Sequence, residues 1–293
     1  MKIIEGTVPF HGYQTWYRLV GECTGNQKPL VLLHGGPGST HNYFELLDSL
    51  AKQDRALLMY DQLGCGNSYL DGHPELWNFD TWDEELLNLL DRLHITEYHL
   101  LGQSWGGMLA MGFLLKHQPD GCRSVILSST LSSASLWAHE QHRLITFLSE
   151  EEQAAIAEAE KTGEFSSEAY QKANAHFMVQ HCAAVPSEND PECLRRPKKS
   201  GSEAYLYGWG PNEYNPTGSL GSFEITDRLN ELHVPALIMS GTNDLCTPLV
   251  AKTMYDHLPD AEWYLFDGCR HMCFAEHPEE YQNILNSWML AHD

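Results

Sequence analysis

Residues 102–106 form the pentapeptide Gly-Gln-Ser-Trp-Gly, whose central residue, Ser104, could act as a nucleophile. The apolar run 98–101 precedes it, and the residues that follow, 107–116, have helical character. A serine flanked by glycines between a strand and a helix is typical of a nucleophile elbow, a sharp turn that exposes the hydroxyl. Because a serine hydroxyl is a weak nucleophile on its own, the chain must also supply a base, an orienting acid and an oxyanion hole.

A histidine and an aspartate occupy the loops in which these partners are expected. Asp244 follows the next-to-last predicted strand, and His271 follows the last one. The order serine, aspartate, histidine is that of the α/β-hydrolases. We therefore predict that His271 is the base and that Asp244 orients it. Asn243 could not carry the charge that stabilises an imidazolium, and Asp267 lies beside the base loop itself.

The loop His34-Gly-Gly-Pro-Gly38 follows the apolar run 30–33, at the place where lipases and esterases carry an oxyanion loop of the HGGG type. Small residues allow backbone N–H groups to come close to a developing negative charge. We predict that the oxyanion donors are the N–H groups of Gly36 and of Trp105, the residue after the nucleophile. A Gly/Pro turn without a catalytic role is the alternative interpretation.

The elements that must position these loops alternate between strands and helices. The segment 13–20 alternates in polarity, as an outer antiparallel strand would. Helices are predicted over 43–52 and over 82–93, the second with Thr81 as its N-cap. Short apolar runs typical of buried strands occur at 30–33 and 56–60, and further strands are predicted at 98–101, 124–127, 235–239 and 262–266. This order favours a mostly parallel sheet with helices on both faces.

The alternation stops after Ser128, and residues 131–226 contain only helical patterns and polar loops. Ser149-Glu-Glu-Glu152 is a capping box that predicts the start of a helix. An interruption of nearly a hundred residues between two strands of a sheet is typical of a functional lid. We therefore predict an α/β-hydrolase core formed by residues 1–130 and 227–293, and a helical cap formed by residues 131–226.

The composition excludes several classes of partner. With 18 Lys+Arg against 40 Asp+Glu, the net charge is −22, which disfavours nucleic acid and anionic membranes. No apolar stretch is long enough to span a bilayer, and the N-terminus lacks the apolar core of a signal peptide. The eight cysteines are scattered without a C-x-x-C pair, so we expect free thiols in a reducing cytoplasm rather than a zinc site. The sequence leaves a homo-oligomer open.

Three segments together resemble the proline iminopeptidases, and the similarity runs the full chain. They are His34-Gly-Gly-Pro-Gly38, Asp61-Gln-Leu-Gly-Cys-Gly-Asn-Ser68 and Gly102-Gln-Ser-Trp-Gly-Gly107. The resemblance implies the α/β-hydrolase fold, with a mostly parallel eight-stranded sheet and a helical cap between the sixth and seventh core strands. It also implies a cytoplasmic serine peptidase without a metal or other cofactor. Such an enzyme removes an N-terminal residue, preferably proline, from peptides with a free N-terminus.

In that family, carboxylates of the cap hold the free α-amino group of the substrate, and Glu213 is the matching position. A carboxylate in a pocket of low dielectric both attracts the amine and fixes its register. Some relatives carry a glutamate directly after the triad aspartate, but here that residue is Leu245. The second amine partner is therefore open, with Glu203 as one candidate. Candidates for the apolar walls around a pyrrolidine ring, with core packing as the alternative, are Tyr205, Tyr207 and Trp209.

Two other function classes remain. An esterase or amidase of small acyl substrates would use the same triad without demanding a free amine. A binding protein without catalytic activity is a third hypothesis, against which the complete triad argues. Epoxide hydrolases and haloalkane dehalogenases resemble this chain less, because their nucleophile is an aspartate and the candidate here is Ser104.

Overall fold

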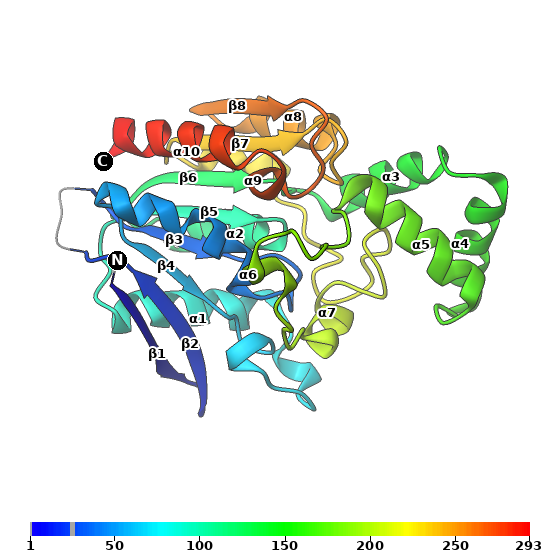
Figure 1. The fold of residues 1–293 in the computed structure, drawn as a ribbon, viewed down its shortest axis with the longest axis horizontal. Helices are drawn as coiled ribbons and strands as arrows, with labels where there is room; N and C mark the ends of the chain where they lie inside the picture. The colour runs from blue at the N-terminus through cyan, green and yellow to red at the C-terminus, as the bar shows by residue number, and fades with distance from the viewer. Residues whose placement is uncertain (1, 24–26) are drawn as a thin grey trace.

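The computed structural model describes residues 2–23 and 27–293, in which eight strands form one sheet in the order β1-β2-β4-β3-β5-β6-β7-β8 (Figure 1). The strands are β1 (Ile3–Phe10), β2 (Tyr13–Val20), β3 (Leu30–Leu33), β4 (Leu57–Tyr60), β5 (Tyr98–Gln103), β6 (Cys122–Ser128), β7 (Ala236–Gly241) and β8 (Ala261–Phe266). β2 runs antiparallel to both β1 and β4, and the other neighbouring pairs are parallel. The mostly parallel, eight-stranded sheet is thus confirmed.

Helices cover both faces of the sheet, and each face has its own apolar core. In β3, Val31 and Leu33 pack into one core while Leu30 and Leu32 pack into the other, as the two-residue period of a strand requires. The first face is covered by α1 (Phe79–Arg92), α2 (Trp105–His117) and α8 (Pro248–His257). The second face is covered by the 3-10 helix η1 (His41–Gln53), α9 (Cys273–Glu276) and α10 (Pro278–His292).

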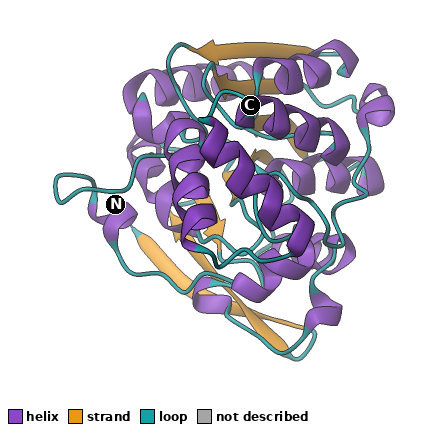
Figure 2. Cartoon of the chain, turned by 90° about the vertical axis from the view of Figure 1, so that its right-hand side faces the viewer, coloured by secondary structure: helices purple, strands orange, loops and turns teal. Residues whose placement is uncertain are grey.

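The helices between β6 and β7 lie beyond the carboxyl ends of the parallel strands (Figure 1). The α-helices are α3 (Ala134–Ile145), α4 (Glu150–Thr162), α5 (Glu168–His181), α6 (Glu192–Arg195) and α7 (Ser202–Gly208), and the 3-10 helix η4 (Thr226–Glu231) leads into β7. Seen from that side, helices of this segment lie in front of the strands (Figure 2). The predicted capping box is present: the Ser149 hydroxyl accepts from the N–H of Glu152, whose carboxylate accepts from the N–H of Ser149.

The chain changes direction across the sheet between β3 and β5. The connection after β3 leads to β4 on one side, whereas the connection after β5 leads to β6 on the other side, so the two connections leave in opposite directions. This arrangement leaves a crevice at the carboxyl ends of the two strands, where ligands of α/β proteins usually bind. The loop that begins at His34 follows β3, and Ser104 follows β5 directly, so both predicted catalytic elements border this crevice.

Several local predictions need correction. Thr81 is not an N-cap: α1 already begins at Phe79, because the side chain of Asn78 accepts a hydrogen bond of 3.1 Å from the Thr81 N–H. The segment predicted as a helix over 43–52 is the 3-10 helix η1. The strand β1 was not predicted. It pairs with β2, so β1 and not β2 is the outer strand at this edge of the sheet. Within residues 2–23 and 27–293, none of the helices combines the length and apolar character needed to cross a membrane.

Candidate active site

Ser104 occupies a strained turn between β5 and α2. Its backbone angles, φ +56° and ψ −125°, lie in a region that side-chain-bearing residues rarely adopt. The turn is held from both sides, since the Ser104 N–H donates to the Ser128 carbonyl at 3.0 Å and the Thr130 hydroxyl donates to the Ser104 carbonyl at 2.6 Å. The surrounding backbone therefore fixes the conformation that a nucleophile elbow requires.

The glycines that flank Ser104 are required by close approaches of the backbone. A Cβ on Gly102 would lie 2.2 Å from the carbonyl oxygen of Gly106, and a Cβ on Gly106 would lie 2.0 Å from that of Leu33. The elbow thus packs directly on the end of β3. This contact brings Ser104 next to the loop that begins at His34.

We expect Gly106→Ala to lower the free energy of unfolding by about 3 kcal/mol, because the added carbon must displace the backbone of Leu33. Urea denaturation followed by circular dichroism measures the loss. Gly163→Ala is the matched control: nothing lies within 4 Å of a Cβ at Gly163, so only its left-handed backbone, with φ +74°, opposes the change. That strain costs about 1 kcal/mol. Equal losses in the two variants would contradict the packing role of Gly106.

Asp244 and His271 form a buried pair at the carboxyl ends of β7 and β8. Nδ1 of His271 lies 2.6 Å from Oδ1 of Asp244, and their side chains are 6% and 0% exposed. The same carboxylate accepts hydrogen bonds from the N–H of Cys246 at Oδ1, and from the Ser129 hydroxyl and the N–H of Gly241 at Oδ2. All these partners are donors, which suits an ionised carboxylate. With the proton on Nδ1, Nε2 of His271 is the nitrogen left to act as a base.

The side chains of Ser104 and His271 line one cavity of about 550 Å³. Asp244 reaches this cavity only through His271. The hydrogen bonds of the described residues include none between Ser104 and His271, and such catalytic hydrogen bonds often shorten only when substrate binds. The structure therefore brings Ser104, His271 and Asp244, the three predicted triad residues, together at one place.

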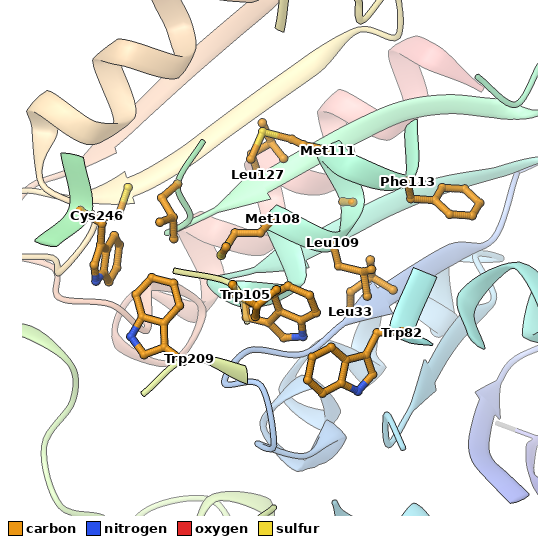
Figure 3. Close-up of a cluster of buried hydrophobic side chains, with 14 of the residues drawn as sticks. Leu33, Trp82, Trp105, Met108, Leu109, Met111, Phe113, Leu127, Trp209 and Cys246 are labelled. Carbon is orange, nitrogen blue, oxygen red and sulfur yellow. The ribbon is translucent and has the colours of Figure 1, made fainter. Parts of the chain in front are cut away.

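Gly36 and Trp105, the predicted oxyanion donors, border Ser104 in a small inner cavity of about 10 Å³. Gly36 has φ +115°, a conformation that favours glycine. The indole of Trp105 is buried, donates from Nε1 to the side-chain oxygen of Gln62 at 2.7 Å, and packs edge-on against Trp82 with ring centres 5.1 Å apart. Figure 3 shows these two rings beside each other in the apolar core. The contacts hold the backbone that carries the Trp105 N–H.

His34 braces the same region as a neutral ring. Its Nδ1 donates to the Gly35 carbonyl at 2.9 Å, and its Nε2 accepts from the N–H of Gln62 at 3.0 Å. Complete burial lowers the pKa of His34 to about 4. The side chain of Gln62 donates to the His34 carbonyl and accepts from Trp105, so it links the two loops that carry the predicted oxyanion donors. Sequence reasoning missed Gln62 in this role, although it belongs to the second of the three recognised segments.

Glu213 extends from the loop after α7 into the cavity that Ser104 and His271 line. The Tyr205 hydroxyl donates to Oε1 of Glu213 at 2.7 Å, and the Trp137 indole donates to its carbonyl oxygen at 2.8 Å. Burial raises the pKa of Glu213, while the Tyr205 hydrogen bond and the nearby His271 lower it. A carboxylate that is held in this way, partly out of water, is suited to bind a cation.

The aromatic candidates separate into two groups. Tyr205 lines the 550 Å³ cavity, and Trp209 lines the inner cavity beside Ser104. Trp209 is 3% exposed and packs edge-on against Trp137, with ring centres 6.4 Å apart. Tyr207 is 49% exposed and is absent from the described lining of both cavities, so its predicted contact with substrate is wrong.

Neither Glu203, the candidate for a second amine partner, nor Leu245, the position where some relatives carry a glutamate, is among the described residues that line the cavity. The carboxylate of Glu203 accepts hydrogen bonds from the Trp77 indole at 2.6 Å and from the N–H groups of Gly72 and His73, so it ties α7 to that loop. The suggestion that Glu203 binds the substrate amine is wrong for this reason. Leu245 is fully buried in the apolar core. Glu213 is the only carboxylate among the described residues that line the cavity.

The segment between β6 and β7 holds the loop that carries His271, a contact that sequence reasoning missed. The N–H of His271 donates to the carbonyls of His181 and Cys182, both at 3.1 Å, at the end of α5. The neighbouring Arg270 donates from Nη1 to the Val179 carbonyl at 2.7 Å. No sequence pattern indicates that residues nearly ninety positions apart meet in this way. The position of the base therefore depends on the segment inserted between β6 and β7.

Known proteins are similar to this chain in sequence and in fold. A family model described as the alpha/beta hydrolase fold matches residues 28–278. The proline iminopeptidase of Clostridioides difficile (strain 630) is 56% identical over 293 residues, which cover all of both chains. The chain belongs to the proline iminopeptidase family.

Solved structures agree with membership of the proline iminopeptidase family. The proline iminopeptidase of Mycobacterium smegmatis superposes with a TM-score of 0.86 at 32% identity, covering 99% of this chain and 98% of that one. The crystal structure of VinJ superposes with a TM-score of 0.90 at 31% identity, covering 99% of both chains. The predicted α/β-hydrolase fold and the resemblance to the proline iminopeptidases are thus confirmed.

Proposed function

We propose that this protein is a serine aminopeptidase that releases the N-terminal residue, preferably proline, from peptides with a free N-terminus. The observation that carries the proposal is the place of Glu213, which lines the same cavity as Ser104 and His271. An aminopeptidase must hold a cationic amine next to the first peptide bond. A carboxylate fixed beside the nucleophile supplies both the attraction and the register for that task.

In the proposed mechanism, the Ser104 hydroxyl attacks the first carbonyl carbon while Nε2 of His271 takes its proton. Asp244, hydrogen-bonded to Nδ1, stabilises the imidazolium that forms. The N–H groups of Gly36 and Trp105 bind the oxyanion. His271 then gives the proton to the departing amine, which leaves an acyl-enzyme ester on Ser104. Water, activated by the same histidine, hydrolyses this ester and releases the N-terminal residue.

Residues 131–226 act in this proposal as a cap that closes the site above the elbow. The cap contributes Glu213 and Tyr205 to the cavity and, through the end of α5, holds the N–H of His271. A cytoplasmic location stays a prediction of the sequence.

The proposal is tested against an esterase or amidase by the requirement for a free amine. We would compare hydrolysis of a prolyl-arylamide with hydrolysis of its N-acetylated form. The acetyl group removes the positive charge that Glu213 binds, so only the free substrate should be used efficiently. Similar kcat/KM values for the two substrates would contradict the aminopeptidase and favour an acyl hydrolase.

We expect Glu213→Gln to lower kcat/KM for the prolyl-arylamide by about a hundredfold, mainly through KM, because a buried cation loses its charged partner. The pH dependence gives a second readout. Amine binding needs the ionised carboxylate and is lost as the pH falls through the pKa of Glu213, which burial raises. The loss should therefore begin at a higher pH than for an exposed glutamate, and Glu213→Gln should remove this acid limb.

Tyr205→Phe is the matched variant for that pH profile. It removes the hydrogen bond that lowers the pKa of Glu213 but keeps the carboxylate. The acid limb should then move to higher pH. An acid limb of 1/KM that is identical in the wild type and both variants would exclude Glu213 as the amine partner.

A further inference from the structure

The described lining of the cavity that contains Ser104 includes one carboxylate and one lysine side chain. Among its described lining residues, Glu213 is the only Asp or Glu, and Lys198 is the only Lys or Arg. Acidic residues outnumber basic ones by more than two to one in this chain, with 40 against 18. Lys198 belongs to the basic run Arg195-Arg-Pro-Lys-Lys199, of which it alone is among the described residues that line this cavity. The two charges give the cavity a dipolar character.

The backbone around Lys198 is fixed to the oxyanion loop and its neighbour. The Lys199 carbonyl accepts from the N–H of Gly66 at 2.7 Å, and the N–H of Gly201 donates to the Gly38 carbonyl at 2.8 Å. A Cβ on Gly38 would lie 2.4 Å from the carbonyl oxygen of Gly201, so the two segments touch backbone to backbone. Lys198 is thus carried by a segment of defined position at the cavity wall.

Lys198 has no carboxylate partner among the described side chains. Asp61, the acid that acts on its charge, is already engaged, because Oδ1 accepts from the backbone and ring of His41 and Oδ2 accepts from the backbone and side chain of Asn67. Lys198 is exposed to solvent, and its ammonium, which has no carboxylate partner among the described side chains, is free to pair with an anionic group that a ligand brings.

Lys198 and Glu213 lie at different parts of the cavity. Glu213 also lines the inner cavity together with Ser104 and Trp105. Lys198 instead also lines two adjoining cavities of about 430 and 360 Å³, so it lies where the three meet. The volume of about 550 Å³ is that of a site for a small ligand, since such sites span about 300–1,000 Å³.

We propose that Lys198 binds the C-terminal carboxylate of a short peptide whose N-terminal amine is held by Glu213. The inference rests on the proposed aminopeptidase function and names its substrate class: zwitterionic di- or tripeptides with both ends free. The two charged contacts would select peptides whose length allows the amine to reach Glu213 while the carboxylate reaches Lys198. Longer or C-terminally blocked peptides would lose the second contact.

The test compares peptides that differ only at the C-terminus. We would measure kcat/KM for Pro-Ala and Pro-Ala-Ala and for their C-terminal amides. The wild type should prefer the free acid of at least one pair, with the difference in KM. Lys198→Met should lower that acid-to-amide ratio by about tenfold, the effect of losing one charge-assisted hydrogen bond.

Lys199→Met is the matched control, because Lys199 is the next residue but its ammonium lies over the ring of Tyr69, 3.2 Å from the ring centre, and does not line the active-site cavity. Its acid-to-amide ratio should equal that of the wild type. Thermal melting of both variants checks that they fold.

Two results would overturn the role of Lys198. An equal fall for acid and amide in Lys198→Met would show a structural effect, and wild-type kcat/KM values for both would show that no carboxylate is bound there. A prolyl-arylamide, which has no carboxylate, separates this failure from that of the proposed function. If the wild type does not hydrolyse it, the aminopeptidase proposal fails, whereas normal hydrolysis with an unchanged ratio rejects Lys198 alone.

Discussion

Ser104→Ala is expected to lower kcat for a prolyl-arylamide by about 10⁴- to 10⁶-fold, because no other group can form the acyl-enzyme. The activity that remains would come from the oxyanion donors and from substrate binding. Alanine keeps the Cβ, so the strained turn and its hydrogen bonds to Ser128 and Thr130 are retained. Steady-state kinetics measure the loss, and thermal melting should show an intact fold.

A fluorophosphonate probe provides the control for that result. It should label the wild type at Ser104 and leave Ser104→Ala unlabelled. Turnover by the variant within about a hundredfold of the wild type would be too fast for catalysis without the nucleophile, and the assignment would be withdrawn. The same conclusion would follow if the probe labelled another serine in a Ser104→Ala variant that kept full activity.

Asp244→Asn is expected to lower kcat by about 10³- to 10⁴-fold, because an amide cannot replace this carboxylate without a conflict. Oδ1 faces the ring N–H of His271 and the N–H of Cys246, and Oδ2 faces the N–H of Gly241. An NH₂ group at either position meets a backbone donor. If it lies toward His271, that ring must shift its proton to Nε2, the nitrogen that is needed as the base.

Asp267→Asn is the matched control for this prediction. Asp267 follows β8 on the same chain segment as the base, but it is exposed to solvent. Its kcat should stay within about twofold of the wild type, as expected for a surface change away from the site. A Tm close to the wild-type value would show that Asp244→Asn is folded. A loss smaller than tenfold in Asp244→Asn would contradict the role of Asp244.

The elements that carry Ser104, Asp244 and His271 could be predicted because their signals are local. A buried strand that lies between two helix-covered faces is mostly apolar, as in β3 (Leu-Val-Leu-Leu), and the predicted oxyanion loop directly follows that run. The chain order of the three residues then limits which loops can meet. The Thr81 error arose from a local competition, since Asn78 caps the same helix three residues earlier.

The contacts of the segment between β6 and β7 could not be predicted, because periodicity reports which face of an element is buried but not its partner. Glu203 shows the difference: its sequence context is that of a cap carboxylate near Glu213, yet it binds the loop that contains Trp77. Lys198 lies in a polar stretch of sequence that is typical of solvated surface, and only the structure places it on the cavity wall. Such assignments depend on contacts between segments far apart in the chain.

The hydrogen bonds from His271 to the end of α5 also limit how this enzyme can be re-engineered. A lid that only covers a cleft can be deleted or exchanged between relatives as a module. Here the inserted segment supplies the carbonyls of His181 and Cys182 that anchor the base loop, so its deletion would leave His271 without support. A chimera with a foreign cap should therefore retain residues 179–182 together with the loop that carries His271, as one inherited unit.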